Sequence, residues 1–216
     1  NPFGDNEHQQ RQACFFLAAI NYFAVKSVLN SVSEGMSFFQ SVTGTLAHEA
    51  KHLKFITPVG FPMMQKYTHW ETKKIKLFLW DRETKRYQRT QSGARVKDNK
   101  FVDKRKSKSA CAPNLIHAMD SCHLLATVNK VAEQGVEDFF LVHDSFGTVP
   151  SDTSKMFYAV REAFIEQYTD YCLFQDVLDQ AKKQLSDTGL SRLQCEIPPK
   201  GNLDLNGVFN SDFCFA

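Results

Sequence analysis

Residues 139–149 combine two apolar runs with a polar triplet between them, and they read Phe139-Phe140-Leu141-Val142-His143-Asp144-Ser145-Phe146-Gly147-Thr148-Val149. Four consecutive apolar residues predict a strand that enters a core, and the chain resumes as a second strand after the triplet. The tip of such a hairpin holds Asp144 rigidly, and a carboxylate on a stiff element suits a Mg²⁺ site. The alternative is that Asp144 and Ser145 only form a turn, which both residue types favour.

Helices are predicted on both sides of this segment. Asn114 is a candidate cap for a helix that runs to about residue 134, where Gly135 ends it. Downstream, helices are predicted over 150–171 and over roughly 174–186, and the tail from residue 198 is expected to be extended or loosely turned.

The N-terminal part is expected to begin with two helices. Apolar residues at three- and four-residue steps predict a mostly buried helix over 9–30, and a break over 31–35 separates it from a second helix over 36–52. A strand over 53–57 and an extended segment over 61–67 follow. The sequence therefore predicts an α+β fold in which an antiparallel hairpin is flanked by helices.

The net charge of +2 hides a strongly basic segment. Residues 72–108 hold fourteen Lys and Arg against four Asp and Glu, whereas the rest of the chain holds twelve against twenty. Short strands over 74–80 and 85–89 predict a β-hairpin, and residues 91–109 are expected to be an exposed loop. Aromatic residues among these cations favour nucleic-acid contact, because cations bind phosphates while rings stack on bases. A merely solvated hairpin is the alternative. The aromatic residues are Tyr67, Trp70, Trp80 and Tyr87.

Length and composition exclude several classes of protein. A chain of 216 residues suits one large domain or two small ones. No apolar run approaches the ~20 residues of a membrane helix, and the first residues lack the features of a signal peptide. The six Cys include no C-x-x-C pair, so they predict free, buried thiols in a reducing cytoplasm and neither a disulfide framework nor a zinc site.

The segment from His143 to Thr148 resembles the third catalytic motif of the single-subunit, bacteriophage-type RNA polymerases. Related DNA polymerases usually carry an acidic residue where this chain has Ser145, and mitochondrial relatives typically carry Trp at the position of Gly147. The resemblance extends over residues 55–216, while residues 1–54 carry no specific motif. Four further segments resemble the family: 57–62, 112–124, 199–205 and 211–216.

This resemblance implies a portion of a right-hand polymerase. Residues 1–112 would be part of the fingers, with a promoter-reading hairpin at about 67–109, and residues 113–216 would be the C-terminal half of the palm. The family transfers nucleotides with two Mg²⁺ ions, and Asp144 would be a catalytic metal ligand here. The resemblance also gives a role to the neighbouring His143, which would orient the site and contact the primer end.

Further site residues follow from the same resemblance. His117 and Ser145 would contact the nucleotide or the product duplex, with His117 in the minor groove near the ribose 2′-hydroxyl. A core or capping histidine is the alternative for His117. Phe213, Phe215 and Ala216 would pack beneath the active site.

The basic hairpin would read promoter bases in the major groove. Lys and Arg suit guanine and Gln suits adenine, although contacts to phosphates alone are an equal alternative for each residue. The candidates are Lys74, Lys76, Arg86, Gln88 and Arg89.

Two family motifs have no counterpart in this sequence. One supplies a second metal-binding Asp, and the other supplies Arg and Lys for the triphosphate before a Tyr-Gly pair, whereas no Tyr here precedes Gly. We therefore expect the C-terminal part of a polymerase that is inert alone and takes its second Asp ligand from an upstream portion. Half of a split polymerase and a basic DNA-binding module on a palm remnant are alternatives. A His-Asp hydrolase is disfavoured, because adjacent strand residues face opposite sides.

The expected partners are those of a phage transcription enzyme. They comprise promoter DNA, the template strand, the RNA product, ribonucleoside triphosphates and the upstream portion, with no membrane. The expected location is the cytoplasm of an infected bacterium.

Overall fold

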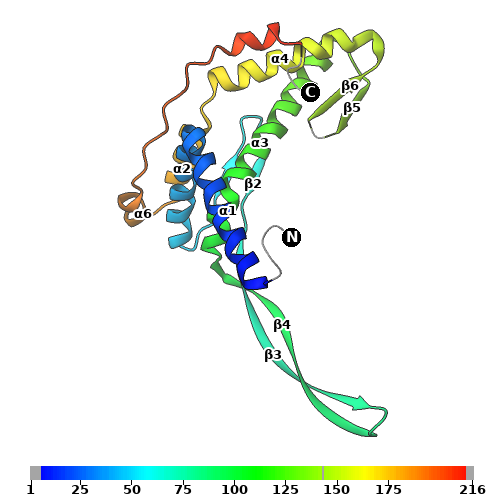
Figure 1. Ribbon diagram of the computed structural model, residues 1–216. Coiled ribbons are helices and arrows are strands. Elements are labelled where there is room, and N and C mark those ends of the chain that lie inside the picture. Colours follow the sequence, from blue (N-terminus) through cyan, green and yellow to red (C-terminus); the bar gives the residue numbers. More distant parts are fainter. Residues whose placement is uncertain (1–5, 143, 213–216) are drawn as a thin grey trace.

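The computed structural model describes residues 6–142 and 144–212, without the side chains of residues 97–100. Helices alternate with three separate two-stranded antiparallel sheets, so the predicted α+β class is confirmed (Figure 1). The long helix α3 (Lys104–Glu133) runs through the molecule and connects its two ends (Figure 1).

The first two helices differ from the prediction in their boundary and in their burial. Helix α1 (Glu7–Val28) and helix α2 (Asn30–His48) meet at 102°, with the break at Leu29. The residues predicted to break the helix, 31–35, lie inside α2, where Gly35 packs so closely against Phe174 that a Cβ atom would lie 3.1 Å from its Cζ.

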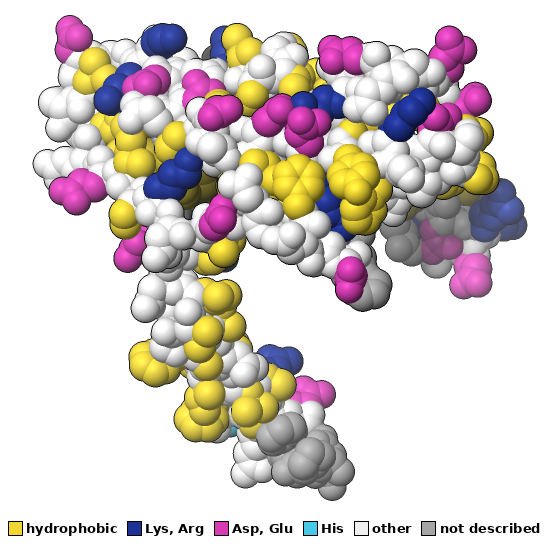
Figure 2. All heavy atoms as spheres, turned by 90° about the horizontal axis from the view of Figure 1, so that it is seen from above, with side chains coloured by type: hydrophobic (Ala, Val, Ile, Leu, Met, Phe, Trp, Pro, Cys, Tyr) yellow, Lys and Arg dark blue, Asp and Glu magenta, His cyan; other side chains and the backbone are white. Residues whose placement is uncertain are grey.

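The prediction that the first helix is mostly buried is wrong. No residue of α1 is buried, and Phe15, Phe16 and Phe23 are 65–76% exposed. Figure 2 shows α1 as an arm that projects from the body and carries hydrophobic side chains over much of its visible surface. An apolar helix is buried only where another element covers it, and α1 meets little besides α2 among the described residues.

A small hairpin follows α2, as the extended segments predicted. Strand β1 (Lys54–Ile56) pairs with β2 (Pro62–Met64) in antiparallel register. The chain reverses at Gly60, whose φ of +84° is readily adopted only by glycine, and its N–H donates to the Thr57 carbonyl. This hairpin packs beside α3 and α5.

The basic segment forms one long hairpin. Strand β3 (Thr68–Asp81) pairs with β4 (Arg86–Val102), and the ribbon extends far from the body (Figure 1). The predicted loop over 91–109 is wrong, because residues 91–102 continue β4 and residues 104–109 begin α3. Strands that face water on both sides show no apolar alternation, so the sequence pattern did not reveal this pairing.

Helix α3 begins ten residues before the predicted cap at Asn114. Asp103 is its cap, and the Asp103 carboxylate accepts a hydrogen bond from the Lys106 N–H at 3.0 Å. Pro113 lies inside the helix. The boundary predicted between residues 112 and 113 therefore falls within one continuous helix.

The C-terminal half contains the predicted short hairpin and its helices. Strand β5 (Phe139–Val142) pairs with β6 (Ser145–Thr148), and a 3-10 turn (Pro150–Asp152) leads into α4 (Thr153–Asp170). The helix predicted over 174–186 corresponds to α5 (Leu173–Lys182), which is shorter than predicted. A further short helix, α6 (Asp187–Arg192), follows it. The tail is extended until a 3-10 helix at Leu205–Asn210.

Two hydrophobic clusters stabilise the molecule. The larger joins α2, β1, α3 and α5, and includes the fully buried Val42, Leu46, Leu115 and Val177. The smaller joins the end of α3 to α4 beneath the β5–β6 hairpin, and it is described below.

The described cysteines are free thiols, as predicted for these residues. Cys111 and Cys122 are buried, but Cys14 and Cys172 are exposed, so the expectation of burial is wrong for those two. Within the described ranges, no single helix is long and apolar enough to cross a membrane. By length and composition, only the bent pair α1 and α2 taken together reaches that threshold.

Candidate catalytic hairpin and nucleic-acid interface

Asp144 lies at the tip of the β5–β6 hairpin. Val142 pairs with Ser145, so residues 143 and 144 form the connection between the strands. Asp144 is exposed, and no described residue donates a hydrogen bond to its carboxylate or forms an ion pair with it. Among the described residues, none occupies its oxygens. His143 lies outside the described residues.

The inner face of this hairpin is anchored in the smaller hydrophobic cluster. Phe139 and Phe146 pack against Val131, Met156 and Val160, which come from α3 and α4. Aromatic burial of this kind fixes a short hairpin that would be marginal alone. The hairpin therefore presents Asp144 from a stiff support.

His123 of α3 strengthens this anchor. Its ring meets the Phe146 ring edge-on, with centroids 5.4 Å apart, and its Nε2 lies 2.8 Å from the Val160 carbonyl oxygen. Burial lowers the pKa of His123, although the hydrogen bond to Val160 acts in the opposite direction. The neutral imidazole is therefore favoured at this position.

The outer face of the hairpin is open. Ser145, Phe140 and Val142 are exposed and share this face by the strand register. A Cβ atom at Gly147 would lie 3.2 Å from the Phe140 carbonyl oxygen, so this position favours glycine. Ser145 thus lies beside Asp144 on a surface that a ligand can approach.

Asp144 is the candidate metal ligand at the tip of this hairpin. No three His, Cys, Asp or Glu side chains within the described part of the chain come together as a metal site. Mg²⁺ is commonly held by one or two carboxylates together with phosphates and waters. Asp144 fits the role of one such ligand, and the other protein ligands would have to come from elsewhere.

His117 lines a pocket of about 400 Å³ between α3 and the β1–β2 hairpin. It is exposed and lies within α3, so it is neither a core histidine nor a helix cap. Asn114 and Ser121 of α3 line the same pocket, as do Phe61 and Gln65 from the β1–β2 side. The pocket therefore offers polar groups among apolar walls.

The predicted promoter residues divide between the two faces of the β3–β4 hairpin. Lys74 and Lys76 share a face with Phe78, which pairs across the ribbon with Arg89. Arg95, which the sequence did not single out, pairs with Thr72 and joins this face. We call the surface formed by Lys74, Lys76, Arg89 and Arg95 the cationic face.

Exposed aromatic rings accompany the cationic face. Trp80 and Tyr87 are paired across the strands, with ring centroids 5.1 Å apart, and they are 54% and 69% exposed. Aromatic rings stack on bases and cations contact phosphates, so a surface that carries both suits a nucleic acid. Among side chains that the structure describes, no Lys or Arg of residues 73–108 forms an ion pair.

Arg86 and Gln88 lie on the opposite face. Asp81 pairs with Arg86 in the strand register, and the Gln88 amide donates a hydrogen bond to the Asp81 carboxylate. Gln88 is therefore already engaged by its own hairpin. Leu77 and Leu79 lie on this second face and are partly exposed.

The first turns of α3 extend the basic surface beyond the hairpin. The sequence placed these residues in a loop, and the structure places them on the helix instead. The Lys104 ammonium lies 3.2 Å from Nδ1 of His48 at the end of α2. The residues are Lys104, Arg105, Lys106 and Lys108.

Three candidate regions are thus arranged along α3. The basic hairpin leads into its first residue and the Asp144 hairpin follows its end (Figure 1). The His117 pocket lies along the side of α3. A helix of 30 residues is roughly 45 Å long at 1.5 Å per residue. The two hairpins therefore occupy opposite ends of the molecule.

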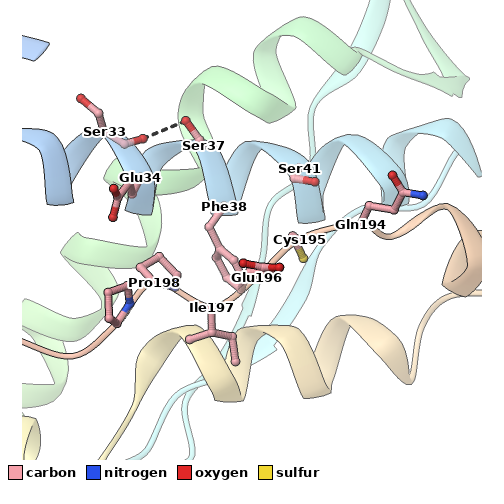
Figure 3. Close-up of a pocket in the computed structure, with 11 residues that line it drawn as sticks. Ser33, Glu34, Ser37, Phe38, Ser41, Gln194, Cys195, Glu196, Ile197 and Pro198 are labelled. Atoms are coloured by element: carbon pink, nitrogen blue, oxygen red, sulfur yellow. Dashed lines mark hydrogen bonds between the residues drawn. The ribbon is translucent and has the colours of Figure 1, made fainter.

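A second hollow lies on another surface and contains none of the predicted site residues. It has a volume of about 560 Å³ and lies between α2 and the extended segment 194–199 (Figure 3). Phe38 of α2 points toward the segment that carries Cys195 and Glu196, and Ser33, Ser37 and Ser41 of α2 also line the hollow. Burial raises the pKa of the Cys195 thiol, which makes it a poor nucleophile.

The predicted supporting residues at the C-terminus are not placed by this structure. Phe213, Phe215 and Ala216 lie outside the described residues. The closest described segment, the 3-10 helix at Leu205–Asn210, packs on α4, and the Ser211 carbonyl accepts a hydrogen bond from Arg161 at 3.0 Å.

Comparison with known proteins gives one consistent family. The sequence model of the family described as DNA-dependent RNA polymerase matches residues 3–195. T7 RNA polymerase of Escherichia phage T7 is 32% identical over 96% of this chain, and the DNA-directed RNA polymerase of Enterobacteria phage K11 is 34% identical over 95%. The chloroplastic/mitochondrial DNA-directed RNA polymerase 2 of Arabidopsis thaliana is 29% identical over 99%.

The extent of these matches adds two facts. This chain spans about a quarter of the phage relatives, 24% of the T7 protein and 23% of the K11 protein, and 19% of the Arabidopsis protein. The similarity also includes most of residues 1–54, where no specific motif was recognised. Helical segments without glycine or polar motifs give few residues by which a family can be identified.

Proposed function

The chain belongs to the DNA-dependent RNA polymerase family, of the single-subunit phage type, and we propose that it is the C-terminal part of such an enzyme. The proposed activity is transfer of ribonucleotides to an RNA 3′ end on a DNA template. The observation that carries this proposal is the exposed Asp144 at the tip of a hairpin that is anchored from beneath. Residues 1–112 would then belong to the fingers and 113–216 to the palm, with α3 crossing between them.

Asp144 is this chain's proposed ligand for two catalytic Mg²⁺ ions. Bound Mg²⁺ would favour ionisation of the attacking RNA 3′-hydroxyl and neutralise charge on the phosphates. The stiff anchor formed by Phe139 and Phe146 would keep the Asp144 carboxylate at a fixed position. A second Asp is expected from the upstream portion.

The neighbouring residues would bind the nucleic acid and the nucleotide. We propose that His143 orients the site and contacts the primer end, while Ser145 and His117 contact the nucleotide or the product duplex. The exposure of Ser145 and His117 supports these roles. Phe213, Phe215 and Ala216 are proposed to pack beneath the active site.

The β3–β4 hairpin is proposed to bind promoter DNA. The cationic face would meet the DNA, so Lys74, Lys76 and Arg89 are favoured over the remaining two candidates for direct contact. Arg86 and Gln88 would contact bases only if Gln88 released Asp81. The absence of described ion pairs for these cations supports a polyanionic partner.

An upstream polymerase portion is the proposed partner of α1. A helix with so many exposed apolar side chains needs a cover, and the relatives are about four times longer than this chain. We propose that the remaining polymerase chain packs on α1, whether covalently attached or separate. The similarity to phage enzymes supports a site of action in the cytoplasm of an infected bacterium.

A reconstitution experiment tests this function. The 216-residue chain is purified and assayed for transcription on a promoter template with Mg²⁺, alone and together with an upstream portion that carries the missing Asp, Lys and Tyr motifs. We expect RNA synthesis only in the combined sample. Synthesis by the chain alone would contradict the proposal, and DNA binding without any synthesis by the combination would favour a DNA-binding module.

A further inference from the structure

Gln65 is a buried residue whose side-chain amide has no partner among the described residues. It follows β2, and its backbone N–H donates to the Leu53 carbonyl at 2.9 Å. The residue is only 4% exposed, yet neither Oε1 nor Nε2 forms a hydrogen bond to any described group. It lines the same 400 Å³ pocket as His117.

The other polar groups of this pocket are mostly satisfied within the protein. The Thr57 hydroxyl accepts from the Phe61 N–H at 3.0 Å, and the Asn114 amide donates to the Tyr67 hydroxyl at 3.1 Å. The Ser121 hydroxyl donates to the His117 carbonyl at 3.0 Å. Gln65 differs from them because both ends of its amide are unsatisfied.

An unsatisfied buried amide destabilises a protein, and an apolar side chain of similar shape is tolerated better at such a position. Met63 and Met64, immediately before Gln65, line the same pocket, so the surroundings would accept an apolar residue. Because the amide has no described hydrogen-bond partner in the free fold, a ligand in the pocket is a natural source of its hydrogen bonds.

We infer that Gln65 is a second product-contacting residue beside His117, and that its amide binds a ribose 2′-hydroxyl of the RNA strand. This inference rests on the proposed polymerase function. An amide both donates and accepts, and so does a hydroxyl, so one 2′-hydroxyl satisfies either end of the amide. These hydroxyls line the wide minor groove of A-form duplexes.

The base edges fit the amide less well. The minor-groove edges of bases present mainly acceptors, which would leave the amide oxygen without a donor. The apolar walls at Val59, Phe61 and Met63 suit the carbon face of a ribose instead. Contact requires the Gln65 side chain to rotate into the pocket, because its amide atoms are shielded in the free protein.

The test uses the polymerase assembled from this chain and its upstream portion. Fluorescence anisotropy measures affinity for a short RNA–DNA hybrid and for hybrids with one 2′-deoxy substitution at successive positions of the RNA strand. Gln65→Met keeps the shape and removes the amide, and Gln65→Leu is the second variant. Thr68→Val is the matched control, because Thr68 is also buried with an unpaired hydroxyl but does not line the pocket.

We expect Gln65→Met and Gln65→Leu to weaken hybrid binding about tenfold, the effect of losing one hydrogen bond to a polar ligand. The loss should vanish for the hybrid that lacks the contacted 2′-hydroxyl. Thr68→Val should bind normally, and none of the three variants should lower the melting temperature.

Two results overturn the inference in different ways. If the unsubstituted polymerase binds the hybrid well and both Gln65 variants bind it equally well, only the assignment of Gln65 is wrong. If the unsubstituted polymerase shows no affinity for the hybrid and makes no RNA, the proposed function fails as well.

Discussion

The β3–β4 and β5–β6 hairpins leave opposite ends of α3 and are stabilised in different ways (Figure 1). The first is long, and nearly all of its described side chains face water, so it depends on cross-strand pairing. The second has strands of four residues and depends on the cluster beneath Phe139 and Phe146. A binding element can extend and adapt to a partner, whereas a carboxylate that holds metal must be fixed.

The sharpest test of this contrast is removal of the carboxylate at the β5–β6 tip. Asp144→Ala in the assembled polymerase should reduce RNA synthesis about a thousandfold or more, because metal ligation supplies several kcal/mol of transition-state stabilisation. Promoter affinity should stay unchanged, since the β3–β4 hairpin is untouched. Single-round transcription and filter binding measure the two quantities.

Asp138→Asn is the matched control for this change. Asp138 lies directly before β5, and it is the Asp138 backbone carbonyl that accepts from the Thr148 hydroxyl, at 2.8 Å. Asp138→Asn should transcribe normally. Equal loss of DNA binding and synthesis in Asp144→Ala would show that the hairpin serves binding rather than catalysis.

The same Phe→Ala substitution in each hairpin tests whether the β5–β6 hairpin depends on its hydrophobic cluster more than the β3–β4 hairpin depends on its exposed rings. Phe146→Ala removes the ring that meets His123 and the smaller cluster, and should lower the free energy of unfolding by about 2–3 kcal/mol. Phe78→Ala removes a ring that is 65% exposed and should change it by no more than about 0.5 kcal/mol. Urea titration measures both, and equal losses would contradict the contrast.

Substitutions on the two faces of the β3–β4 hairpin should have unequal effects on DNA binding. The triple variant Lys74→Ala, Lys76→Ala and Arg89→Ala should weaken promoter binding about tenfold or more and reduce the salt-dependence slope by about three, if each cation meets one phosphate. Arg86→Ala with Gln88→Ala should have a smaller effect, because Gln88 is bound to Asp81. Titration at several salt concentrations measures both slopes, and equal slopes would remove the distinction between the faces.

The sequence predicted the β5–β6 hairpin and missed half of β3–β4 for one physical reason. Phe139 packs on the smaller cluster, and the apolar run over residues 139–142 is visible in the chain itself. Residues 91–96 pair with β3 and mostly face water, so their composition resembles that of a loop. Burial of α1 was predicted wrongly because apolar character indicates a need for a partner and does not show whether that partner is present.

The candidate site shows the same division. Asp144 and His117 were found through short motifs, and both proved exposed and accessible. Arg95 and Gln65 carry no motif, since they become candidates only through strand register and burial. Local patterns therefore indicated candidate residues, and only the tertiary arrangement revealed which neighbours accompany them.

The smallest expected effect concerns the histidine that supports the β5–β6 hairpin. Burial lowers the pKa of His123 in the folded protein, while the unfolded chain keeps the ordinary value near 6.5. Below about pH 6.5 the unfolded state therefore binds a proton more readily than the folded state, and the free energy of unfolding falls as pH decreases. It should level off once the pH lies below the folded pKa.

Replacing His123 isolates this contribution. His123→Gln keeps a donor for the Val160 carbonyl but has no titrating ring, so the decline in unfolding free energy below pH 6.5 should become shallower. Thr127→Val, buried one turn further along α3, removes a polar atom without a titrating group and should leave the decline unchanged. Urea titrations across this pH range decide the matter. If His123→Gln declined as steeply as the unsubstituted protein, protonation of His123 would not be what weakens the support of the Asp144 hairpin in acid.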